Sequence, residues 1–253
     1  MKHKISRYGW IPDLPDARDR RFRASRAMAA LPRSVDLRSG CPPVYDQGDL
    51  GSCTANAIAG AIEFDQKKQR MPQPFMPSRL FIYYNERAIE GTVSSDSGAT
   101  LRDGIKAVAS QGACPETMWP YVEQRFADRP AAPCYQAGKA HAAVQYSRLP
   151  QTLTQMKSCL AQGYPFVFGF TVYESFESDR VAKTGVASLP GASETAIGGH
   201  AAMAVGYTDA SSTLLVRNSW GPDWGAAGYF TLPYGYVGNL DLAADFWTIR
   251  LVK

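Results

Sequence analysis

The sequence predicts an α+β protein with two unlike lobes. From about residue 54 to 112 the apolar residues recur with helical spacing, whereas from residue 166 onward they form short runs rich in β-branched and aromatic residues. The chain has 253 residues, of which 45% are hydrophobic and 20% charged, so it carries enough apolar material for a sizeable core. Helices that precede strands along the chain are typical of folds in which the two kinds of element segregate.

Four helices are expected in this order. The first covers residues 54–70, where alanine and isoleucine residues share one face. Ser78, Thr100 and Thr152 are favourable N-cap residues, and each precedes a further helical pattern. The helix after Thr152 is expected to end at Gly163, since glycine is common just beyond a helix C-terminus.

The rest of the chain is expected to form a loop and then strands. Residues 113–150 contain several prolines, and we interpret them as loop. Farther on, Gly, Pro, Asp and Ser separate the apolar runs, as is usual between antiparallel strands. The expected strands cover residues 166–172, 201–207, 213–217, 229–232 and 246–252.

Positive charge is concentrated at the N-terminus. Residues 1–32 hold eight Lys or Arg and three Asp, a net charge of +5, whereas residues 33–253 have a net charge of −1. Two interpretations are open: a basic arm that docks on an acidic surface, its own or a partner's, or a solvated tail. A short turn of helix is expected at residues 24–30.

Composition excludes several classes of protein. No apolar run approaches the ~20 residues of a membrane span, and the body has no basic stripe with interleaved aromatics, so neither a membrane nor a nucleic-acid partner is expected. The sequence has no CxxC pair and three histidines, which argues against a structural zinc site. Neither a metal nor a cofactor is therefore expected.

Five cysteines are present, an odd number. If one is a free catalytic thiol, the other four form two disulfides in one of three connectivities, or remain thiols. Disulfides would fit an oxidising compartment and thiols a cytosol. The compartment is left open, with a secreted or periplasmic location ahead of a cytoplasmic one. The four are Cys41, Cys114, Cys134 and Cys159.

A cysteine stands at the start of the first expected helix, in YDQGDLGSCTANAIAG. Free N–H groups and the helix dipole favour a thiolate at Cys53, and a thiolate is the attacking species in cysteine-dependent hydrolysis. The side-chain amide of Gln47 and the backbone N–H of Cys53 are suited to form an oxyanion hole. Taken alone, such a cysteine is more often a buried core residue.

Two further motifs favour the catalytic interpretation. AIGGHAAMAVGYT places His200 at the head of an apolar strand, and LLVRNSWGPDWGAAGYF places Asn218 at the end of the next one. If these strands pair, the Asn218 oxygen accepts from one imidazole nitrogen and leaves the other facing the thiol. Trp220 is expected to shield that hydrogen bond from water, which strengthens a thiolate–imidazolium pair.

The blocks QGxxGSC, GGHAAMAVGY and NSWGxxWGxxGYF resemble, in the same order, the three blocks of the papain family of cysteine peptidases. LPRSVDLRSGCPPVYDQG resembles the family's mature N-terminus, so the resemblance covers about residues 31–253, and it is most similar in style to bacterial members. The chain departs from the family pattern at Leu50, usually Cys, and at Thr54, usually Trp or Tyr. The family's long helical prosegment is missing.

The resemblance implies a papain-like two-lobe fold, with a helical left lobe, an antiparallel β-barrel right lobe and the active-site cleft between them. It implies Cys53 as nucleophile, His200 as acid and base, Asn218 as the residue that orients the histidine, and Gln47 as oxyanion donor. The residues expected to contact a peptide or protein substrate are Gly51, Ser52, Gly98, Gly199, Trp220, Ala244 and Asp245. Ala244 at the pocket floor would favour large apolar side chains and Asp245 basic ones, and the sequence does not choose.

The expected organisation is a propeptide-like segment at residues 1–30 and a peptidase domain at residues 31–253, with the helical lobe at about 31–150 and the β lobe at about 151–253. We expect the segment to lie in or near the cleft, with Trp10 and Ile11 in substrate subsites. The alternative is a strap on the outside of the body.

Two rival functions use the same scaffold. Acyl transfer or deamidation would share the acyl-enzyme, so the catalytic residues do not discriminate it from hydrolysis. A silent peptide-binding homologue would keep the fold, although such relatives usually lose the Cys or the His, and this chain has both. The protein is expected to be a monomer.

Overall fold

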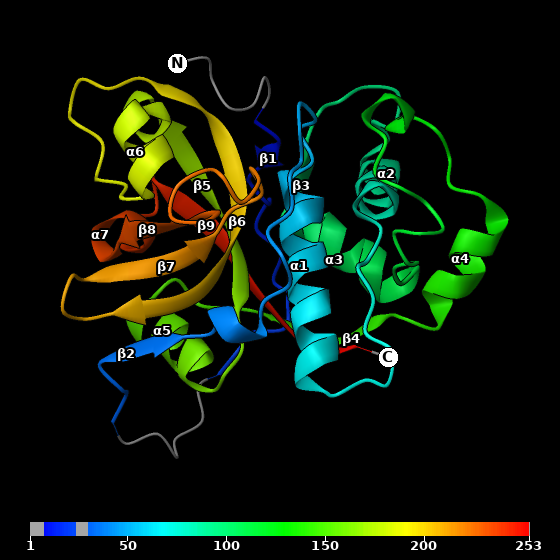
Figure 1. The fold of residues 1–253 in the computed structure, drawn as a ribbon, viewed down its shortest axis with the longest axis horizontal. Coiled ribbons are helices and arrows are strands. Elements are labelled where there is room, and N and C mark those ends of the chain that lie inside the picture. Colours follow the sequence, from blue (N-terminus) through cyan, green and yellow to red (C-terminus); the bar gives the residue numbers. More distant parts are fainter. Residues whose placement is uncertain (1–7, 24–29, 253) are drawn as a thin grey trace.

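The computed structural model describes residues 8–23 and 30–252. Figure 1 shows two lobes side by side, one built of helices and the other around a sheet, with the N-terminal strand β1 (Trp10–Ile11) between them. The expected helical turn at residues 24–30 lies almost entirely outside the described residues. Among the described residues, no helix is both long and apolar enough to cross a membrane.

The helical lobe forms where the local signals predict it. Ser78 accepts a hydrogen bond from the backbone N–H of Phe81, and Thr100 accepts one from Asp103, so both predicted N-caps are confirmed. The third predicted cap, Thr152, is confirmed in the same way. The helices of this lobe are α1 (Cys53–Lys68), α2 (Arg79–Glu90), α3 (Leu101–Ser110) and α4 (Ala132–Lys139), with the short 3-10 turn η2 (Glu123–Arg125).

The prediction that residues 113–150 are loop is wrong at two places. Pro133 lies in the first turn of α4, where a proline costs no intrahelical hydrogen bond. Strand β4 (Ala143–Arg148) pairs with β9 (Ala243–Val252) at the other end of the chain. That pairing joins residues about a hundred positions apart, and the local pattern carries no sign of it.

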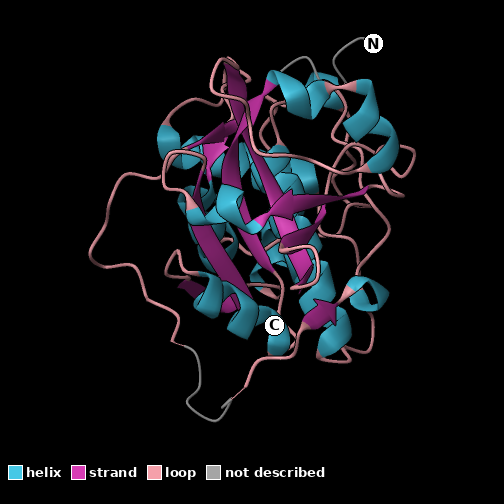
Figure 2. Cartoon of the chain, turned by 90° about the vertical axis from the view of Figure 1, so that its left-hand side faces the viewer, coloured by secondary structure: helices cyan, strands magenta, loops and turns pink. Residues whose placement is uncertain are grey.

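The second lobe contains an antiparallel sheet with strand order β4-β9-β5-β6-β7-β8, and β2 also pairs with β6. Figure 2 shows its long strands running through the middle of the molecule among the helices. The five predicted strands are present, most of them longer than expected. The remaining elements of this lobe are β2 (Ser34–Asp36), η1 (Arg38–Gly40), α5 (Leu153–Ala161), β5 (Phe166–Tyr173), η3 (Glu174–Glu177), α6 (Asp179–Thr184), β6 (Ala196–Thr208), β7 (Thr213–Arg217), β8 (Tyr229–Pro233) and α7 (Tyr234–Gly238).

The two-lobe α+β class is confirmed, but the sheet is open rather than a closed barrel. Its end strands β4 and β8 pair with other segments instead of with each other. The Thr231 N–H donates to the Gly185 carbonyl at 2.7 Å along the outer edge of β8. On β4, Arg148 exchanges backbone hydrogen bonds with Arg20 and Phe22 of the N-terminal segment. Both outer edges of the sheet are therefore covered by other segments, although the sheet does not close into a barrel.

The sheet lies between two hydrophobic cores. Met203 of β6 and Trp247 of β9 pack with helices α1 to α3, whereas their neighbours Ala202 and Phe246 face the aromatic core of the second lobe. Strands β2 and β4 belong to this sheet although they precede residue 150. One face of β6 therefore meets α1, and Cys53 and His200 belong to these two elements.

Candidate active site

Cys53 is the first residue of α1 and is fully buried. Hydrogen bonds from the backbones of Ala201, Gly9 and Thr54 act to lower its pKa, which places these three residues beside the thiol. Ala201 follows His200 in β6, so the thiol lies beside the strand that carries the histidine. The helix N-terminus and the neighbouring strand thus bring together the two residues that the sequence predicts to react.

The loop from Gln47 to Ser52 is held by hydrogen bonds on both sides. Gln47 Nε2 donates to the Leu50 carbonyl at 2.8 Å, and Ser219 Oγ donates to Gln47 Oε1 at 2.7 Å. One hydrogen of the Gln47 amide therefore remains for a further acceptor. The Ser52 hydroxyl lies 2.6 Å from that of Tyr121, which also donates to the Gln47 carbonyl. The Ser52 side chain therefore helps to hold the loop in place.

His200 and Asn218 meet as predicted. His200 Nε2 lies 2.8 Å from Asn218 Oδ1, across the pair of strands β6 and β7 and the turn that follows. His200 Nδ1 has no hydrogen-bond partner among the described residues, and the ring is fully buried. The Asn218 contact therefore assigns the hydrogen to Nε2 in the neutral ring and leaves Nδ1 as the free basic nitrogen.

Aromatic rings enclose the histidine. The Trp220 ring lies 4.8 Å from the His200 ring, and the Phe170 ring meets it edge-on at 5.5 Å. Trp220 packs in turn on Trp224 and Phe176. This apolar wall excludes water from the His200–Asn218 hydrogen bond, as expected for Trp220.

The N-terminal segment, defined here as residues 8–23, occupies the space beside the thiol. The Gly9 carbonyl accepts from the Ala99 N–H at 2.8 Å, and β1 pairs in parallel with β3 (Ala99–Thr100). A Cβ on Gly98 would lie 2.2 Å from the Gly9 oxygen, and one on Gly199 would lie 2.5 Å from the Trp10 oxygen. Predicted substrate-binding glycines therefore line the position that this segment fills.

The Trp10 side chain packs against Gly169 and against Gly199, which precedes His200. Its indole lies against Gly169, where an added Cβ would fall 1.9 Å from the ring, and Trp10 is only 8% exposed. Nε1 donates to Asp245 Oδ2 at 3.2 Å. Ile11 is 41% exposed, because the extended backbone turns its side chain to the face opposite Trp10, and its place in a subsite stays a prediction.

Of the two residues predicted at the pocket floor, Asp245 is the one that reaches the indole, whereas Ala244 pairs with Gly169 in the sheet. The register between β5 and β9 shifts here, and Asp245 has a φ of 58°. A bulge of this kind redirects one side chain out of the regular alternation. Asp245 is also paired with Arg148 at 2.8 Å, which partly neutralises it.

Burial moves the two reactive groups away from ionisation. It raises the pKa of the Cys53 thiol to about 12, although hydrogen bonds from backbone N–H groups oppose the change. It lowers the pKa of His200 to about 4, against the effect of Asn218. Burial disfavours the charged form of each group. In this closed state the pair is a neutral thiol and a neutral imidazole at pH 7.

The expectation of a basic arm on an acidic surface is wrong for the described residues. Asp19 of the segment pairs with Arg102 at 2.7 Å and with Arg148 at 3.0 Å. Arg18 pairs with Asp16 inside the segment itself. Acidic side chains of the segment thus meet basic ones of the body, even though the segment is basic as a whole. Net charge gives no indication of which side chains lie at a contact.

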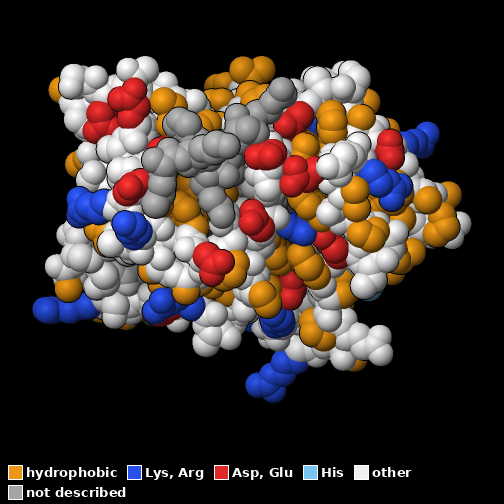
Figure 3. All heavy atoms as spheres, turned by 45° about the horizontal axis from the view of Figure 1, so that its top comes forward, with side chains coloured by type: hydrophobic (Ala, Val, Ile, Leu, Met, Phe, Trp, Pro, Cys, Tyr) orange, Lys and Arg blue, Asp and Glu red, His pale blue; other side chains and the backbone are white. Residues whose placement is uncertain are grey.

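Other surface charges do not change this picture. Figure 3 shows acidic side chains gathered along the middle of the face at the top of Figure 1.

No group of three or more His, Cys, Asp or Glu residues within 8–23 and 30–252 is placed to hold a metal ion. All five cysteines are free thiols, so of the alternatives for the four non-catalytic ones the structure has thiols.

Three supporting residues were missed by the sequence reasoning. Ser219 holds the Gln47 amide, and it directly follows Asn218, so its position offered a signal. Asp96 accepts from the Gly51 N–H at 3.1 Å, and Tyr121 braces Gln47 and Ser52. Asp96 and Tyr121 lie outside the three motifs, and no local pattern marks them. Thr54, which departs from the family pattern, donates to buried Glu86 and so faces the helical lobe.

Two known proteins are similar in sequence to this chain over most of its length. An uncharacterized peptidase C1-like protein of Acanthamoeba polyphaga mimivirus is 47% identical over 215 residues, which are 82% of this chain and 69% of that protein. Pro-cathepsin H of Bos taurus is 28% identical over 223 residues, 83% of this chain and 62% of that protein.

Solved structures agree. Xylellain, a cysteine protease from Xylella fastidiosa, superimposes with a TM-score of 0.91 at 45% identity, covering 97% of this chain and 96% of that one. The expected similarity to bacterial members is thereby confirmed. Procathepsin L 3 of Tenebrio molitor shares the fold, with a TM-score of 0.71 at 20% identity, over 93% of this chain and 75% of that one.

The model of the family described as papain family cysteine protease matches residues 31–247, which include Cys53, His200 and Asn218. The chain therefore belongs to the papain family of cysteine proteases.

Proposed function

We propose that this papain-family protease is latent as a full chain. It hydrolyses peptide bonds through an acyl-thioester on Cys53, and residues 8–23 block the cleft until they are displaced. One observation carries the proposal: the Gly9 backbone lies between Gly51 and Gly98, so close that a Cβ on Gly98 would fall 2.2 Å from the Gly9 oxygen. A scissile peptide needs the same space.

The proposed reaction begins when the segment leaves and water reaches the pair. The Cys53 proton passes to His200 Nδ1, giving a thiolate and an imidazolium whose Nε2–H is held by Asn218. The thiolate attacks the peptide carbonyl, and the C–N bond breaks as the imidazolium gives its proton to the leaving amine. Water then attacks the thioester, with His200 as base, and the acid product departs. The steps require no metal or cofactor.

Gln47 is proposed to stabilise the oxyanion together with the Cys53 N–H. Its amide is fixed by Leu50 and Ser219, so the remaining N–H keeps one direction. A donor held in place before the reaction costs no reorganisation during it, and loss of one such donor typically lowers kcat by about 100- to 1,000-fold. Gly51, Gly98 and Gly199 are proposed to contact the substrate backbone.

The Trp10 pocket is proposed to be a side-chain subsite of the open enzyme. Its walls accept a large aromatic ring beside Gly169, and its floor offers the Asp245 carboxylate to an N–H donor. Because Arg148 already pairs with Asp245, we expect tryptophan and other large side chains to be preferred over small ones, with a weaker preference for basic groups.

The experiment uses the full chain with a recognition sequence for a site-specific protease inserted between residues 23 and 30. The protein is purified intact, cut after folding and separated from the released segment. Hydrolysis of a fluorogenic peptide library is then compared for the uncut chain, the cut chain and a cut Cys53→Ala variant. We expect slow, fast and no hydrolysis respectively. A folded and reduced cut chain that cleaves nothing would refute the proposal and favour acyl transfer or peptide binding.

A further inference from the structure

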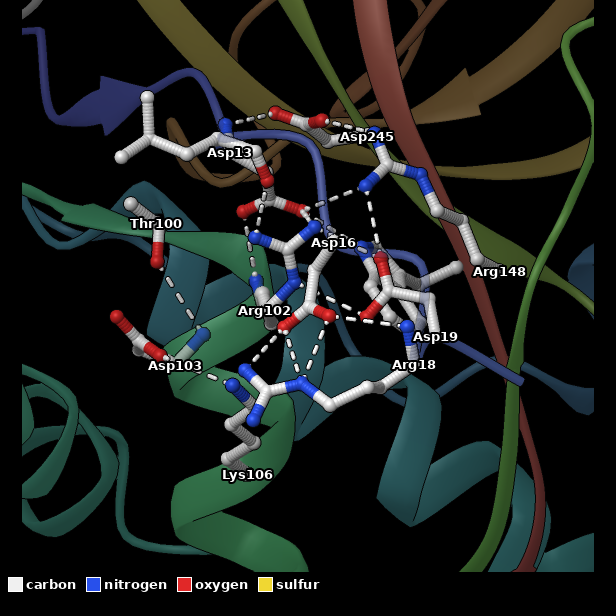
Figure 4. A network of polar contacts seen from close by, with 12 residues as sticks. Asp13, Asp16, Arg18, Asp19, Thr100, Arg102, Asp103, Lys106, Arg148 and Asp245 are labelled. Carbon is white, nitrogen blue, oxygen red and sulfur yellow. Dashed lines mark hydrogen bonds and ion pairs between the residues drawn. The ribbon is translucent and has the colours of Figure 1, made fainter. Parts of the chain in front are cut away.

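Arg102 is bound almost entirely by the N-terminal segment. It lies in the first turn of α3 and is 7% exposed. Its Nε and Nη2 donate to the two carboxylate oxygens of Asp19 at 3.1 and 2.7 Å (Figure 4). Its Nη1 donates to the Leu14 carbonyl. Every hydrogen bond of this guanidinium to a described residue therefore ends on the segment, and all of them are lost when the segment leaves.

A second carboxylate of the segment sits in a pocket beside Arg102. Asp13 has a fully buried side chain, and its oxygens accept from the Arg102 backbone N–H and from Trp247 Nε1, both at 3.0 Å. The Arg148 guanidinium lies 3.7 Å away. Three separate elements, α3, β9 and β4, thus supply donors that converge on one carboxylate.

Among the described residues, Arg102 has a carboxylate partner only while the segment is docked. Asp245 keeps its ion pair with Arg148 at 2.8 Å after release, since both belong to the body. Arg102 keeps no carboxylate. Burial works to raise the pKa of Asp19, but hydrogen bonds from Arg102 and Arg148 outweigh it and hold that pKa below its usual value. The two arginines therefore favour the ionised form of Asp19, whereas burial raises the pKa of Asp13 in spite of its donors.

We infer that Arg102, with Arg148, forms a subsite of the open enzyme that binds an acidic side chain of the substrate. The subsite lies beyond the Trp10 pocket as seen from Cys53, because Gly9 is at the thiol and Asp13 follows Trp10 along the segment. Paired N–H donors in a fixed fork match a carboxylate in two contacts, which a single ammonium does not. This inference rests on the proposed function, since it requires that the segment gives way to substrate.

The test uses the chain that is cut after folding, with internally quenched peptides that contain tryptophan. One Asp, or Asn as its uncharged isostere, is placed in turn at each of the positions flanking the tryptophan. We expect kcat/KM to be at least about 10-fold higher for Asp than for Asn at one position, and the ratio to fall as salt screens the pair. In Arg102→Gln the ratio at that position should approach one.

A matched control is Arg38→Gln, which removes an arginine that also forks onto a carboxylate, that of Asp36, on the other lobe. It should keep the wild-type ratio. If Arg102→Gln fails to fold, the salt-dependent Asp preference of the wild type decides instead. An active enzyme with equal kcat/KM for Asp and Asn at every position, or a preference that survives in folded Arg102→Gln, overturns the subsite alone. A cut chain that hydrolyses no peptide overturns the proposed function as well.

Discussion

At the scale of single residues, the proposed catalytic histidine, His200, is positioned by one side chain. Asn218 contacts His200 Nε2, and the wall of Trp220 and Phe170 keeps water away from that contact. The sequence predicted His200, Asn218 and Trp220 because each lies in a short motif that fixes its own local geometry, whereas Phe170 lies outside these motifs. It did not predict that Asp245 rather than Ala244 reaches the pocket, because that depends on a register shift between two strands.

Replacing Asn218 with Ala should therefore slow the chemical step. A hydrogen bond to a charged group contributes about 1.5–3 kcal/mol, which corresponds to roughly a 10- to 100-fold change in rate. We expect kcat of the cut Asn218→Ala enzyme to fall by about that factor with little change in KM. Steady-state kinetics on one fluorogenic peptide measure both constants, and an unchanged kcat would show that Asn218 does not position the imidazole.

At the scale of elements, local signals predicted the helices better than the connections. Ser78, Thr100 and Thr152 cap helices as expected because a cap is made within four residues. Strand β4 was missed because its stability comes from pairing with β9 and from the segment on its other edge. Long-range pairing of this kind leaves little trace in local periodicity.

Helix α1 contains a buried carboxylate, that of Asp65, whose cost in folding free energy the sequence does not reveal. Both carboxylate oxygens of Asp65 are buried without a hydrogen-bond partner among the described residues. Burial raises the pKa of Asp65 to about 8, against the attraction of Lys68 and Arg250. In the unfolded chain the pKa is close to the ordinary value of 3.8.

Asp65 should therefore make stability fall as pH rises. Between about pH 4 and 8 the folded chain holds a proton that the unfolded chain has lost, so the free energy of unfolding decreases by up to about 1.4 kcal/mol per pH unit. Asp65→Asn should remove this component, and exposed Asp223→Asn should not. Urea unfolding at several pH values measures it. Parallel curves for wild type and Asp65→Asn would contradict the assignment.

At the scale of the whole molecule, the segment joins the two lobes. It pairs with β3 of the helical lobe, places Trp10 against Gly169 of the sheet, and covers the edge of β4. The sequence predicted a segment in the cleft from its composition and from Trp10. The contacts of Asp13 and Asp19 with Arg102 required the folded structure, since these residues are more than eighty positions apart.

Trp10 should be the main anchor of the closed state. Loss of a buried tryptophan side chain costs about 3–5 kcal/mol, far more than loss of an exposed leucine. We expect uncut Trp10→Ala to hydrolyse peptides at least about 10-fold faster than the uncut wild type, approaching the cut enzyme. Leu14→Ala is the matched control within the segment, because its side chain is 81% exposed. Equal activity of the two uncut variants would argue against Trp10 as an anchor.

The central claim is that residues 8–23 keep the Cys53 thiol closed and unionised. The most direct test is the rate of iodoacetamide alkylation at each cysteine, followed by peptide mass spectrometry, in the uncut and the cut chain at pH 7. We expect alkylation of Cys53 to be slow in the uncut chain and to become at least about 100-fold faster after cutting, while buried Cys159 stays slow in both. Equally fast alkylation of Cys53 before and after cutting would contradict the claim.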